Sequence, residues 1–399
     1  MPTEPKTASK WMTRSVVAIA FASLFSDACY ELIIPLLPSF ITSLGGGPFV
    51  LGLMEGLADG IAFPFKLAGG LLADRTRNRR AWTAAGYLGV GIFMPAIALM
   101  HSVAGVVTMR ASAWATRGFR SPIRDTLLVD DTDPRFVNRA FGFQRALDTV
   151  GAVIGPAAAI GLIAIGWPVR DAILLGVVPG LLAASMYLFV RERPRTKPPR
   201  EPLHLALAGL PPTFLRYLVA AGVFGSGNFS ATLLVLVAIR ALTPHVGPVL
   251  AVTYATALYL GHNVLQASTS YPASLLSERI GSGRLLVVSF ALFALVGAAL
   301  ALAATSIPVV VLAFALASVA VAILEPMEGT FATELLPEAR RGTGFGLLAS
   351  VNGIGDFVSS AGVGLLWQVF GTTVAFGTAG AVCAVGTILM LPLAATRRS

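Results

Sequence analysis

Long apolar segments recur along the whole chain, separated by short polar or Gly/Pro-rich turns. Each segment is about 20 residues long or more, which is the length that an α-helix needs to cross ~30 Å of hydrocarbon. The apolar runs are continuous rather than alternating, so they predict helices and exclude a transmembrane β-barrel. We predict twelve transmembrane helices, at residues 15–43, 49–73, 82–101, 103–127, 141–165, 171–190, 215–239, 248–276, 284–303, 306–332, 343–369 and 372–394.

The composition agrees with this pattern. Hydrophobic residues make up 55% of the chain and charged residues 12%, against roughly 25% charged residues in soluble domains. No soluble fold buries so much apolar surface, so a soluble enzyme or binding module is excluded. The first apolar segment is too long for a signal peptide and contains Asp27 and Glu31, so we expect it to stay in the protein. Cys29 and Cys383 lie in separate apolar runs and indicate neither a disulfide framework nor a thiolate metal site.

The formal net charge of +9 first suggests nucleic acid, but the positions of the basic residues favour a membrane orientation. If both termini are cytoplasmic, the cytoplasmic ends and loops carry 21 of the 29 Lys and Arg residues. Only Arg170 and Arg240 fall in predicted outer loops. This is the positive-inside distribution of a multi-pass protein of the cell inner membrane, and it argues against a nucleic-acid partner.

A charged, proline-rich stretch from Arg191 to Pro202 divides the chain near its middle. It predicts an N-terminal six-helix bundle at 1–190, a cytoplasmic linker at 191–214 and a C-terminal six-helix bundle at 215–399. An internal repeat at an offset of 204 residues supports this division, with the matches Pro122 to Pro326, Thr126 to Thr330 and Phe141-Gly142 to Phe345-Gly346. Two parallel halves of this kind are a transporter architecture in which the substrate site lies between the halves.

The loop after the second predicted helix carries a recognisable motif. It runs from Gly70 through Asp74 and Arg75 to Arg79 and Arg80, and it resembles motif A of the major facilitator superfamily, with Arg77 and Asn78 departing from that pattern. A degenerate copy runs from Ser274 to Gly281.

This resemblance covers nearly the whole chain. It implies an all-α membrane protein with twelve transmembrane helices in two pseudo-symmetric six-helix bundles, a transporter rather than an enzyme. It also implies gating roles for Gly70, Asp74, Arg75 and Arg79. An acid at Asp74 would face the positive N-terminal end of the eleventh helix at Gly342-Thr343 and latch the halves together.

Charged residues inside the hydrocarbon cost about 2.5 to 3.5 kcal/mol each, so each is a functional candidate. Asp27 and Glu31 are four residues apart on the first helix and share a face with Tyr30 beside them. Glu55, Asp59 and Lys66 form one stripe on the second helix. The helices carry more acids than bases, and a desolvated carboxyl can bind and release a proton as a cavity alternates. The proton-coupling candidates are Asp27, Glu31, Asp59 and Glu55.

The fourth helix carries Arg110, Arg117 and Arg124 at seven-residue intervals, with Arg120 offset from them. Such a face must meet acids, an anionic substrate or water. On the fifth helix, Arg145 and Asp148 are three residues apart, and we predict a structural role for them, with Asp148 in an ion pair with Arg117 or Arg124.

The family resemblance implies that helices one, four, seven and ten line the central cavity. Tyr259 and His262 share a face of the eighth helix, although a lone histidine is more often a packing residue than a ligand. No metal site or cofactor is indicated. The candidates for the substrate cavity are Tyr30, Arg110, Arg117, Arg120, Arg124, Asn228, Tyr259, His262, Glu325 and Glu328.

The fifth helix contains Gly151, Gly155 and Pro156, which resemble motif C of drug/proton antiporters, with Ala159 in place of the final glycine. The Gly-Pro step interrupts the helical hydrogen bonds and bends the helix at the interface between halves. Together with the strings around Asp27 and Arg117, this resembles a bacterial efflux subgroup.

The resulting hypothesis is a monomeric secondary transporter in the lipid bilayer that couples protons to the efflux of a drug-like, cationic or metal-related small molecule. Two alternatives stay open. One is transport of an organic anion or metal chelate that the arginines of the fourth helix bind. The other is a transport-inactive receptor or scaffold, for which a filled, fully salt-bridged cavity would be the structural sign.

Overall fold

The structure, a computed structural model, describes residues 12–133, 136–192, 210–337 and 341–395. Every regular element within these residues is a helix. The first half comprises α1 (Arg14–Ile33), α2 (Leu37–Ser43), α3 (Pro48–Arg75), α4 (Arg79–Ala96), α5 (Val103–Asp130), α6 (Val137–Ala164), α7 (Val169–Leu175) and α8 (Val177–Ser185), with the 3-10 turns η1 (Ile34–Leu36), η2 (Ile97–Leu99) and η4 (Met186–Phe189).

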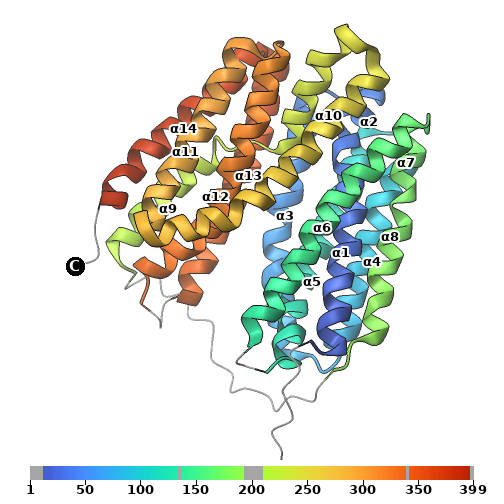
Figure 1. The fold of residues 1–399 in the computed structure, drawn as a ribbon, viewed down its shortest axis with the longest axis vertical. Coiled ribbons are helices and arrows are strands. Elements are labelled where there is room, and N and C mark those ends of the chain that lie inside the picture. Colours follow the sequence, from blue (N-terminus) through green and yellow to red (C-terminus); the bar gives the residue numbers. More distant parts are fainter. Residues whose placement is uncertain (1–11, 134–135, 193–209, 338–340, 396–399) are drawn as a thin grey trace, which may run out of the picture.

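The second half is built of fewer and longer helices. They are α9 (Pro212–Gly225), α10 (Ala231–Ile280), α11 (Ser282–Ala303), α12 (Ile307–Leu335), α13 (Arg341–Phe370) and α14 (Thr372–Ala395). Figure 1 shows the two halves as two groups of roughly parallel helices, blue to green and yellow to red, with α10 beside the first group. The predicted linker lies largely outside the described residues.

The helices of the described chain make twelve crossings, as the apolar pattern predicts. Nine segments are long and apolar enough to span a membrane. One of them, α10, has 50 residues and bends at Gly247, where φ is +78°, so it crosses twice. The two further crossings are α5 (28 residues), which contains four arginines, and α13 (30 residues). The predicted all-α, twelve-helix fold is therefore confirmed.

The seventh crossing differs from the prediction of one helix at 215–239. Helix α9 ends at Gly225 and α10 begins at Ala231, so residues 226–230 form a break inside the crossing. Glycine costs a helix about 1 kcal/mol relative to alanine, and Ser and Asn side chains compete for backbone hydrogen bonds. The sequence Gly225-Ser-Gly-Asn-Phe-Ser230 combines both effects.

A second correction concerns Arg240, which was predicted in an outer loop. It lies within α10, and its guanidinium carbon is 4.8 Å from the centre of the Trp367 ring. The turn comes seven residues later, at Gly247, between Pro244 and Pro248.

Equivalent helices of the two halves begin 204 residues apart, which is the offset of the internal repeat in the sequence. Helix α5 begins at Val103 and α12 at Ile307, and α6 begins at Val137 and α13 at Arg341. Each pair is 204 residues apart. The two halves therefore place equivalent helices at equivalent points of the chain.

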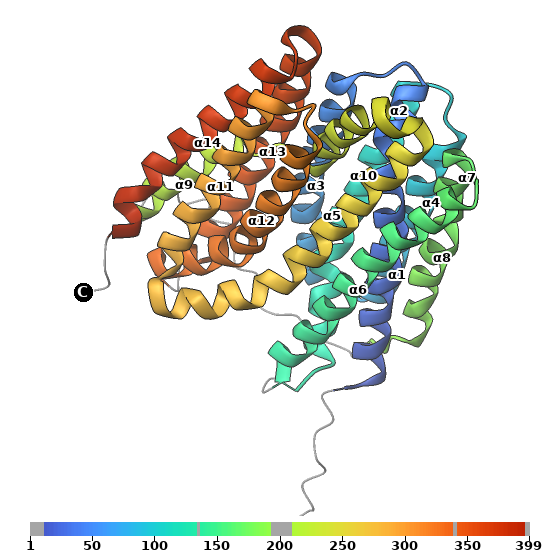
Figure 2. The same ribbon diagram turned by 45° about the horizontal axis from the view of Figure 1, so that its top comes forward.

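The halves meet along two lines of contact, which we name the α3–α13 seam and the α6–α10 seam. Figure 2 shows α10 crossing beside α6 and α1. In the α3–α13 seam, Gly52 lies so close to the Ser360 carbonyl that a β-carbon would not fit, and Gly364 approaches the Pro48 carbonyl in the same way. Small residues allow this contact between backbones in a membrane.

The two ends of the molecule differ. At the distal end, opposite the end where α1 begins, α10 packs on η1 and α2, and the Phe49 amide donates to Gln368 Oε1 at 3.3 Å. At the terminal end, where α1 begins and α14 ends, no atom of another part of the described chain lies within 4 Å of the point where a β-carbon on Gly70 or Gly346 would sit. The bundles are thus in contact distally, whereas Gly70 and Gly346 face open space at the terminal end.

Candidate functional site

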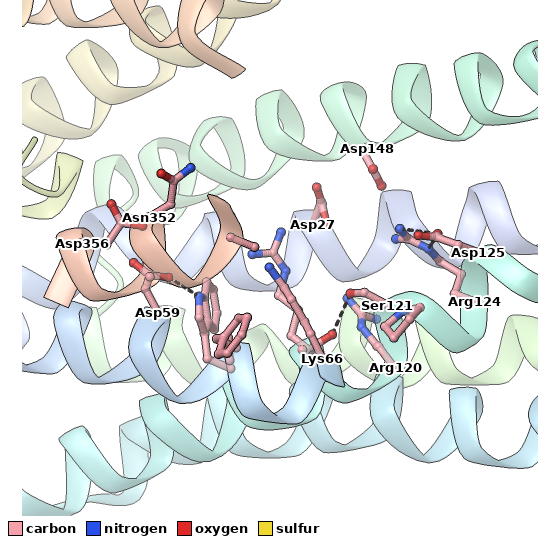
Figure 3. A pocket seen from close by; sticks show the side chains of 18 residues that line it. Asp27, Asp59, Lys66, Arg120, Ser121, Arg124, Asp125, Asp148, Asn352 and Asp356 are labelled. Carbon is pink, nitrogen blue, oxygen red and sulfur yellow. Dashed lines mark hydrogen bonds and ion pairs between the residues drawn. The ribbon is translucent and has the colours of Figure 1, made fainter. Parts of the chain in front are cut away.

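A cavity of about 630 Å³ lies between the halves and reaches towards the terminal end. Its walls come from α1, α3, α5, α6 and α13, as Figure 3 shows. Half of its lining side chains are charged: Asp27, Asp59, Lys66, Arg117, Arg120, Arg124, Asp125, Asp148 and Asp356. A polar cavity between two helix bundles is what a transporter requires.

A second cavity of about 350 Å³ lies deeper, towards the distal end. It shares Asp59, Trp114, Arg117 and Asp356 with the first, so these residues lie between the two cavities, and we name this place the waist. Its other walls include the break in the seventh crossing, where the predicted cavity residue Asn228 lies. The Asn228 carbonyl accepts a hydrogen bond from Ser359 Oγ at 2.7 Å.

The face of α5 that carries the arginines is turned towards this space. Arg110 is buried and forms an ion pair of 2.6 Å with Glu55 on α3. Its guanidinium carbon also lies 3.3 Å from the centre of the Trp114 ring. Glu55, a predicted proton carrier, is therefore held by a buried cation, and both side chains act first as a structural pair.

Arg117 is placed differently from Arg110. It donates to the Tyr30 hydroxyl at 2.9 Å, and its guanidinium carbon lies 4.6 Å from the Tyr30 ring centre. The ion pairs found in the described chain join other residues. Arg117 lines both cavities, so it presents an unpaired cation at the waist.

The other two arginines of α5 have protein partners. Arg120 is buried, donates to Ser26 Oγ at 2.9 Å and lies over the Tyr87 ring. Arg124 forms an ion pair of 2.8 Å with Asp125, the next residue. These two cations line the terminal part of the cavity.

Asp27 and Asp148 face the cavity from α1 and α6 (Figure 3). The predicted ion pair of Asp148 with Arg117 or Arg124 is not among the ion pairs of the described chain. Asp148 accepts a hydrogen bond of 2.5 Å from Gln144, one helical turn before it, whereas the Arg145 side chain is exposed. Gln144 and Asp148 are four residues apart on α6 and point into the bundle together, so their side chains meet. Arg145, three residues before Asp148, points outward.

Acids from both halves meet at the waist. Asp59 of α3 accepts a hydrogen bond of 3.0 Å from the Trp114 indole, and Asp356 of α13 lines the same wall. Glu328 accepts from Asn352 at 2.6 Å, and Glu325 lines the deeper cavity. The predicted acids of α12 therefore do lie beside the cavities.

Glu31 links the two halves. One of its carboxylate oxygens accepts hydrogen bonds from Tyr259 Oη at 2.8 Å and from Asn263 Nδ2 at 3.1 Å, both on α10. The structure thus brings together Glu31 and Tyr259, which the sequence analysis placed in two separate groups of candidates.

His262 is largely buried and lines the deeper cavity together with Tyr259. Its Nδ1 and Ser318 Oγ are 2.8 Å apart, and its ring packs edge-on to Phe314. In the described part of the chain, no group of three His, Cys, Asp or Glu side chains is arranged to hold a metal ion.

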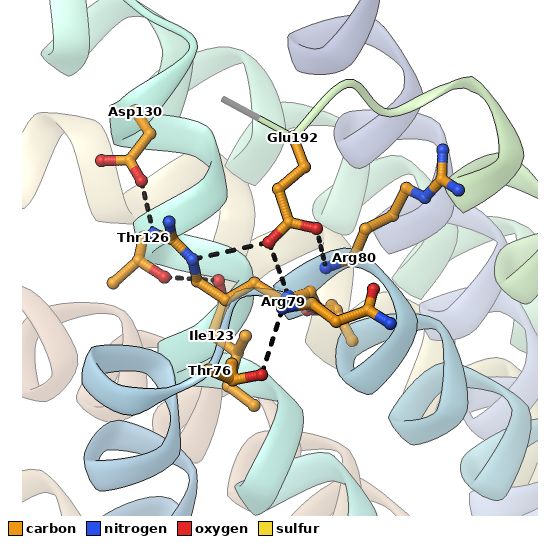
Figure 4. A network of polar contacts seen from close by, with 9 residues as sticks. Thr76, Arg79, Arg80, Ile123, Thr126, Asp130 and Glu192 are labelled. Carbon is orange, nitrogen blue, oxygen red and sulfur yellow. Dashed lines mark hydrogen bonds and ion pairs between the residues drawn. The ribbon is translucent and has the colours of Figure 1, made fainter. Parts of the chain in front are cut away.

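The motif at the end of α3 continues into a polar network, shown in Figure 4. Arg79 is buried and forms an ion pair of 2.5 Å with Asp130 at the end of α5. The Arg79 amide also donates to Glu192 at 2.6 Å. Arg79 therefore braces the terminal end of the first bundle.

The predicted latch between Asp74 and the start of α13 stays a prediction. The described side chains do not include those of Asp74, Arg75, Gly342 and Thr343. Gly70 lies on α3 in open space.

The glycines of the second motif press α6 against α1. A β-carbon on Gly151 would meet the Leu24 carbonyl, and one on Gly155 would lie 2.8 Å from Glu31 Cβ. The two motif glycines thus set the positions of the acidic residues on α1.

Several cavity residues escaped the sequence analysis. Trp114 lies four residues after Arg110 and three before Arg117, a spacing that already places it on the arginine face. Asn352 lies 204 residues after Asp148, so the repeat itself marked that position. Both residues are uncharged, so the cost of charge in hydrocarbon does not mark them.

Comparisons with known proteins agree with this architecture. A family model of the Major Facilitator Superfamily matches residues 19–261 and 219–399. An uncharacterized MFS-type transporter of Methanocaldococcus jannaschii is 28% identical over 359 residues, which are 90% of this chain and 89% of that protein. The multidrug resistance protein MdtG of Escherichia coli is 26% identical over 210 residues, 51% of this chain and 50% of MdtG.

Solved structures show the same fold. A crystal structure of a variant of the nucleoside transporter NupG superposes with a TM-score of 0.81 at 12% identity, covering 95% of this chain and 99% of that one. A bacterial homolog of the human lysosomal transporter Spinster, in an inward-facing and occupied conformation, gives a TM-score of 0.72 at 16% identity, covering 97% and 96%.

Proposed function

This chain belongs to the Major Facilitator Superfamily, and on that premise we propose that it couples protons to the efflux of a small, cationic or amphipathic solute. The observation that carries the proposal is the composition of the cavity between the halves. Its lining has more carboxylates than cations, and they come from both halves. Carboxylates in a low-dielectric cavity that opens to alternate sides are suited to carry protons and to attract a cation.

The geometry favours Asp27 as the proton carrier. It lines the cavity, and no Lys or Arg nitrogen of the described chain lies within ion-pair distance of it. Glu55 is less suitable, because Arg110 already neutralises it. Asp59 and Glu31 have neutral hydrogen-bond donors, Trp114 and Tyr259 respectively, so they are the next candidates.

The proposed direction of transport, export, is supported by the orientation of the protein in the membrane and by its similarity to one known protein. The basic termini and loops favour cytoplasmic termini in the inner membrane, so the open terminal end would face the cytoplasm. Half of this chain is similar to the multidrug resistance protein MdtG, which supports export of a drug-like compound. A receptor without transport would need a filled, salt-bridged cavity, whereas this one has about 630 Å³ of space.

A second substrate class, an organic anion or metal chelate, is favoured by one observation. Arg117 reaches the waist without an ion pair in the described chain, and Lys66 lines the same cavity. Any test of substrate must therefore include anions beside cations.

The experiment measures intravesicular pH in proteoliposomes that hold the purified protein, while cationic, anionic and metal-chelate solutes are added one at a time. We expect a cationic solute to drive a proton flux that is lost in Asp27→Asn. The control is Asp171→Asn, which removes an exposed acid in the first turn of α7, far from the cavity. Proton flux that survives in Asp27→Asn would remove Asp27 from the mechanism, and silence for the whole panel with folded protein would contradict proton-coupled transport.

A further inference from the structure

The Gly155-Pro156 step of α6 leaves one carbonyl without its helical donor. Proline has no N–H, so the carbonyl four residues earlier, that of Ala152, receives no i→i−4 hydrogen bond. Inside a membrane an unsatisfied backbone group costs several kcal/mol, and some other donor has to replace the missing one.

The replacement comes from the other half of the molecule. Asn263 Nδ2, on α10, donates to the Ala152 carbonyl at 3.0 Å. The same nitrogen donates to Glu31 Oε2 at 3.1 Å. Both neighbours are acceptors, so the amide nitrogen, and not the amide oxygen, must face them. One side chain of the second bundle thus holds two helices of the first, α6 and α1.

The remaining contacts complete this arrangement. Tyr259, one turn before Asn263, donates to the same Glu31 oxygen at 2.8 Å. Gly155 lets α1 approach so closely that a β-carbon at this position would lie 2.7 Å from the Leu32 amide. The motif therefore supplies both the free acceptor, through Pro156, and the room for Glu31 beside it, through Gly155.

We propose that Asn263 is a positioning residue that locks the distally closed conformation, by bridging Glu31 and the Ala152 carbonyl that Pro156 frees. In this proposal Pro156 acts by creating an acceptor at the interface, in addition to bending α6. The proposal deepens the proposed function. Only its pH dependence, which requires Glu31 to bind and release a proton, rests on that function.

The charge on Glu31 sets the strength of the bridge. A carboxylate accepts both donors on Oε2 through charge-assisted bonds, which are about twice as strong as neutral ones. A protonated Glu31 loses that advantage, so proton binding loosens the α6–α10 seam. The groups that face Glu31 are Arg110 and Arg117 of α5, Asp27 and Tyr30 of α1, and Tyr259 of α10.

The test measures the distance between the halves at the distal end, by pulsed electron paramagnetic resonance of the full chain in lipid nanodiscs. Spin labels are placed at Ser43→Cys and Thr305→Cys, one at the end of α2 and one between α11 and α12, after Cys29 and Cys383 are replaced by alanine. We expect Asn263→Ala and Pro156→Ala each to raise the population of the distally separated state by about threefold to fifteenfold, since a side-chain hydrogen bond in a membrane is worth about 0.6 to 1.7 kcal/mol.

The matched control is Pro392→Ala in α14, a helix proline whose side chain is exposed and far from the other half. It should leave the distances unchanged. The double variant Asn263→Ala/Pro156→Ala should shift the population no further than Asn263→Ala alone, because Asn263→Ala already removes the bond to the Ala152 carbonyl on which Pro156→Ala acts. Glu31→Gln should shift the population in the same direction and remove its dependence on pH.

Two outcomes would overturn the proposal. One is a Pro156→Ala variant that behaves like Pro392→Ala, and the other is an additive double variant. If Asn263→Ala does not fold, Asn263→Ser is measured in its place with the same expectation. Because this readout is a distance, its failure leaves proton-coupled transport untouched, and a silent transport assay leaves the lock untouched.

Discussion

The two seams between the halves occupy equivalent places in the repeat and are held by different forces. In the α3–α13 seam, backbones touch at Gly52 and Ser360, and apart from the Phe49–Gln368 hydrogen bond at its exposed distal end, the contact depends on shape. In the α6–α10 seam, one amide, that of Asn263, carries the polar connection. A tight steric fit resists change at every point, whereas a single hydrogen bond can be made and broken.

The repeat makes this difference visible residue by residue. Tyr259 lies 204 residues after Glu55, Asn263 after Asp59, and Asp356 after Ala152. In the α6–α10 seam, Asn263 donates to the Ala152 carbonyl. At the equivalent positions of the α3–α13 seam, the carboxylates of Asp59 and Asp356 lie at the waist. Apolar packing sets the positions of the helices, so the two halves share them. A few polar residues differ between the halves, and they make the interaction energies of the two seams different.

The largest effect should come from Glu55, on the α3 side of the comparison. Glu55→Gln leaves Arg110 as a buried charge without a counter-ion, which costs about 3–5 kcal/mol. We expect a large fall in the midpoint of thermal unfolding, measured on the purified protein in detergent. The double variant Glu55→Gln/Arg110→Gln should recover most of that loss, and a double variant as unstable as the single one would contradict the pair.

The next effect tests shape in the same seam. Gly52→Ala adds a methyl group where the Ser360 carbonyl leaves no room, and overpacking costs about 1–3 kcal/mol. Gly60→Ala, two turns along α3, meets only ordinary contacts with Phe357 and should leave the unfolding midpoint nearly unchanged. Equal behaviour of the two variants would mean that steric fit does not hold this seam.

A smaller effect of opposite sign is expected at the waist. Asp356→Asn removes a carboxylate at the waist, where Asp59 lines the same two cavities. Two acids in one low-dielectric wall disfavour each other's charge, so we expect a gain in the free energy of unfolding on the order of 1 kcal/mol. Thermal denaturation of the purified protein measures it, and a loss of stability would refute the repulsion.

The smallest effect belongs to the α6–α10 seam. Tyr259→Phe removes one of two donors to Glu31 and should cost about 0.6 kcal/mol. Tyr254→Phe changes an exposed tyrosine on the same helix and serves as the control. A Tyr259→Phe effect as large as that of Glu55→Gln would abolish the contrast between the seams.

The sequence was sufficient to predict the fold. A membrane-spanning chain needs long apolar helices, and the apolar segments and the internal repeat give their number. Helical periodicity showed which residues share a face, and the resemblance to the family placed the arginine face of α5 and Asp27 of α1 beside a cavity, where they lie. The partners of those residues did not follow from the sequence. Arg110 meets Glu55 and Asn263 meets Glu31 only through packing of distant helices, and Asp148, expected beside Arg117 or Arg124, accepts a hydrogen bond from Gln144 instead.

The brace of Arg79, Asp130 and Glu192 has a consequence for how the halves are tied together. Because Glu192 is fixed to the first bundle, the covalent tether to the second starts there and runs over residues 193–209 to Leu210. The described contacts between the halves lie in the two seams, so recognition between the halves resides there. Two separately expressed polypeptides, divided between Glu192 and Leu210, should therefore assemble into an intact protein.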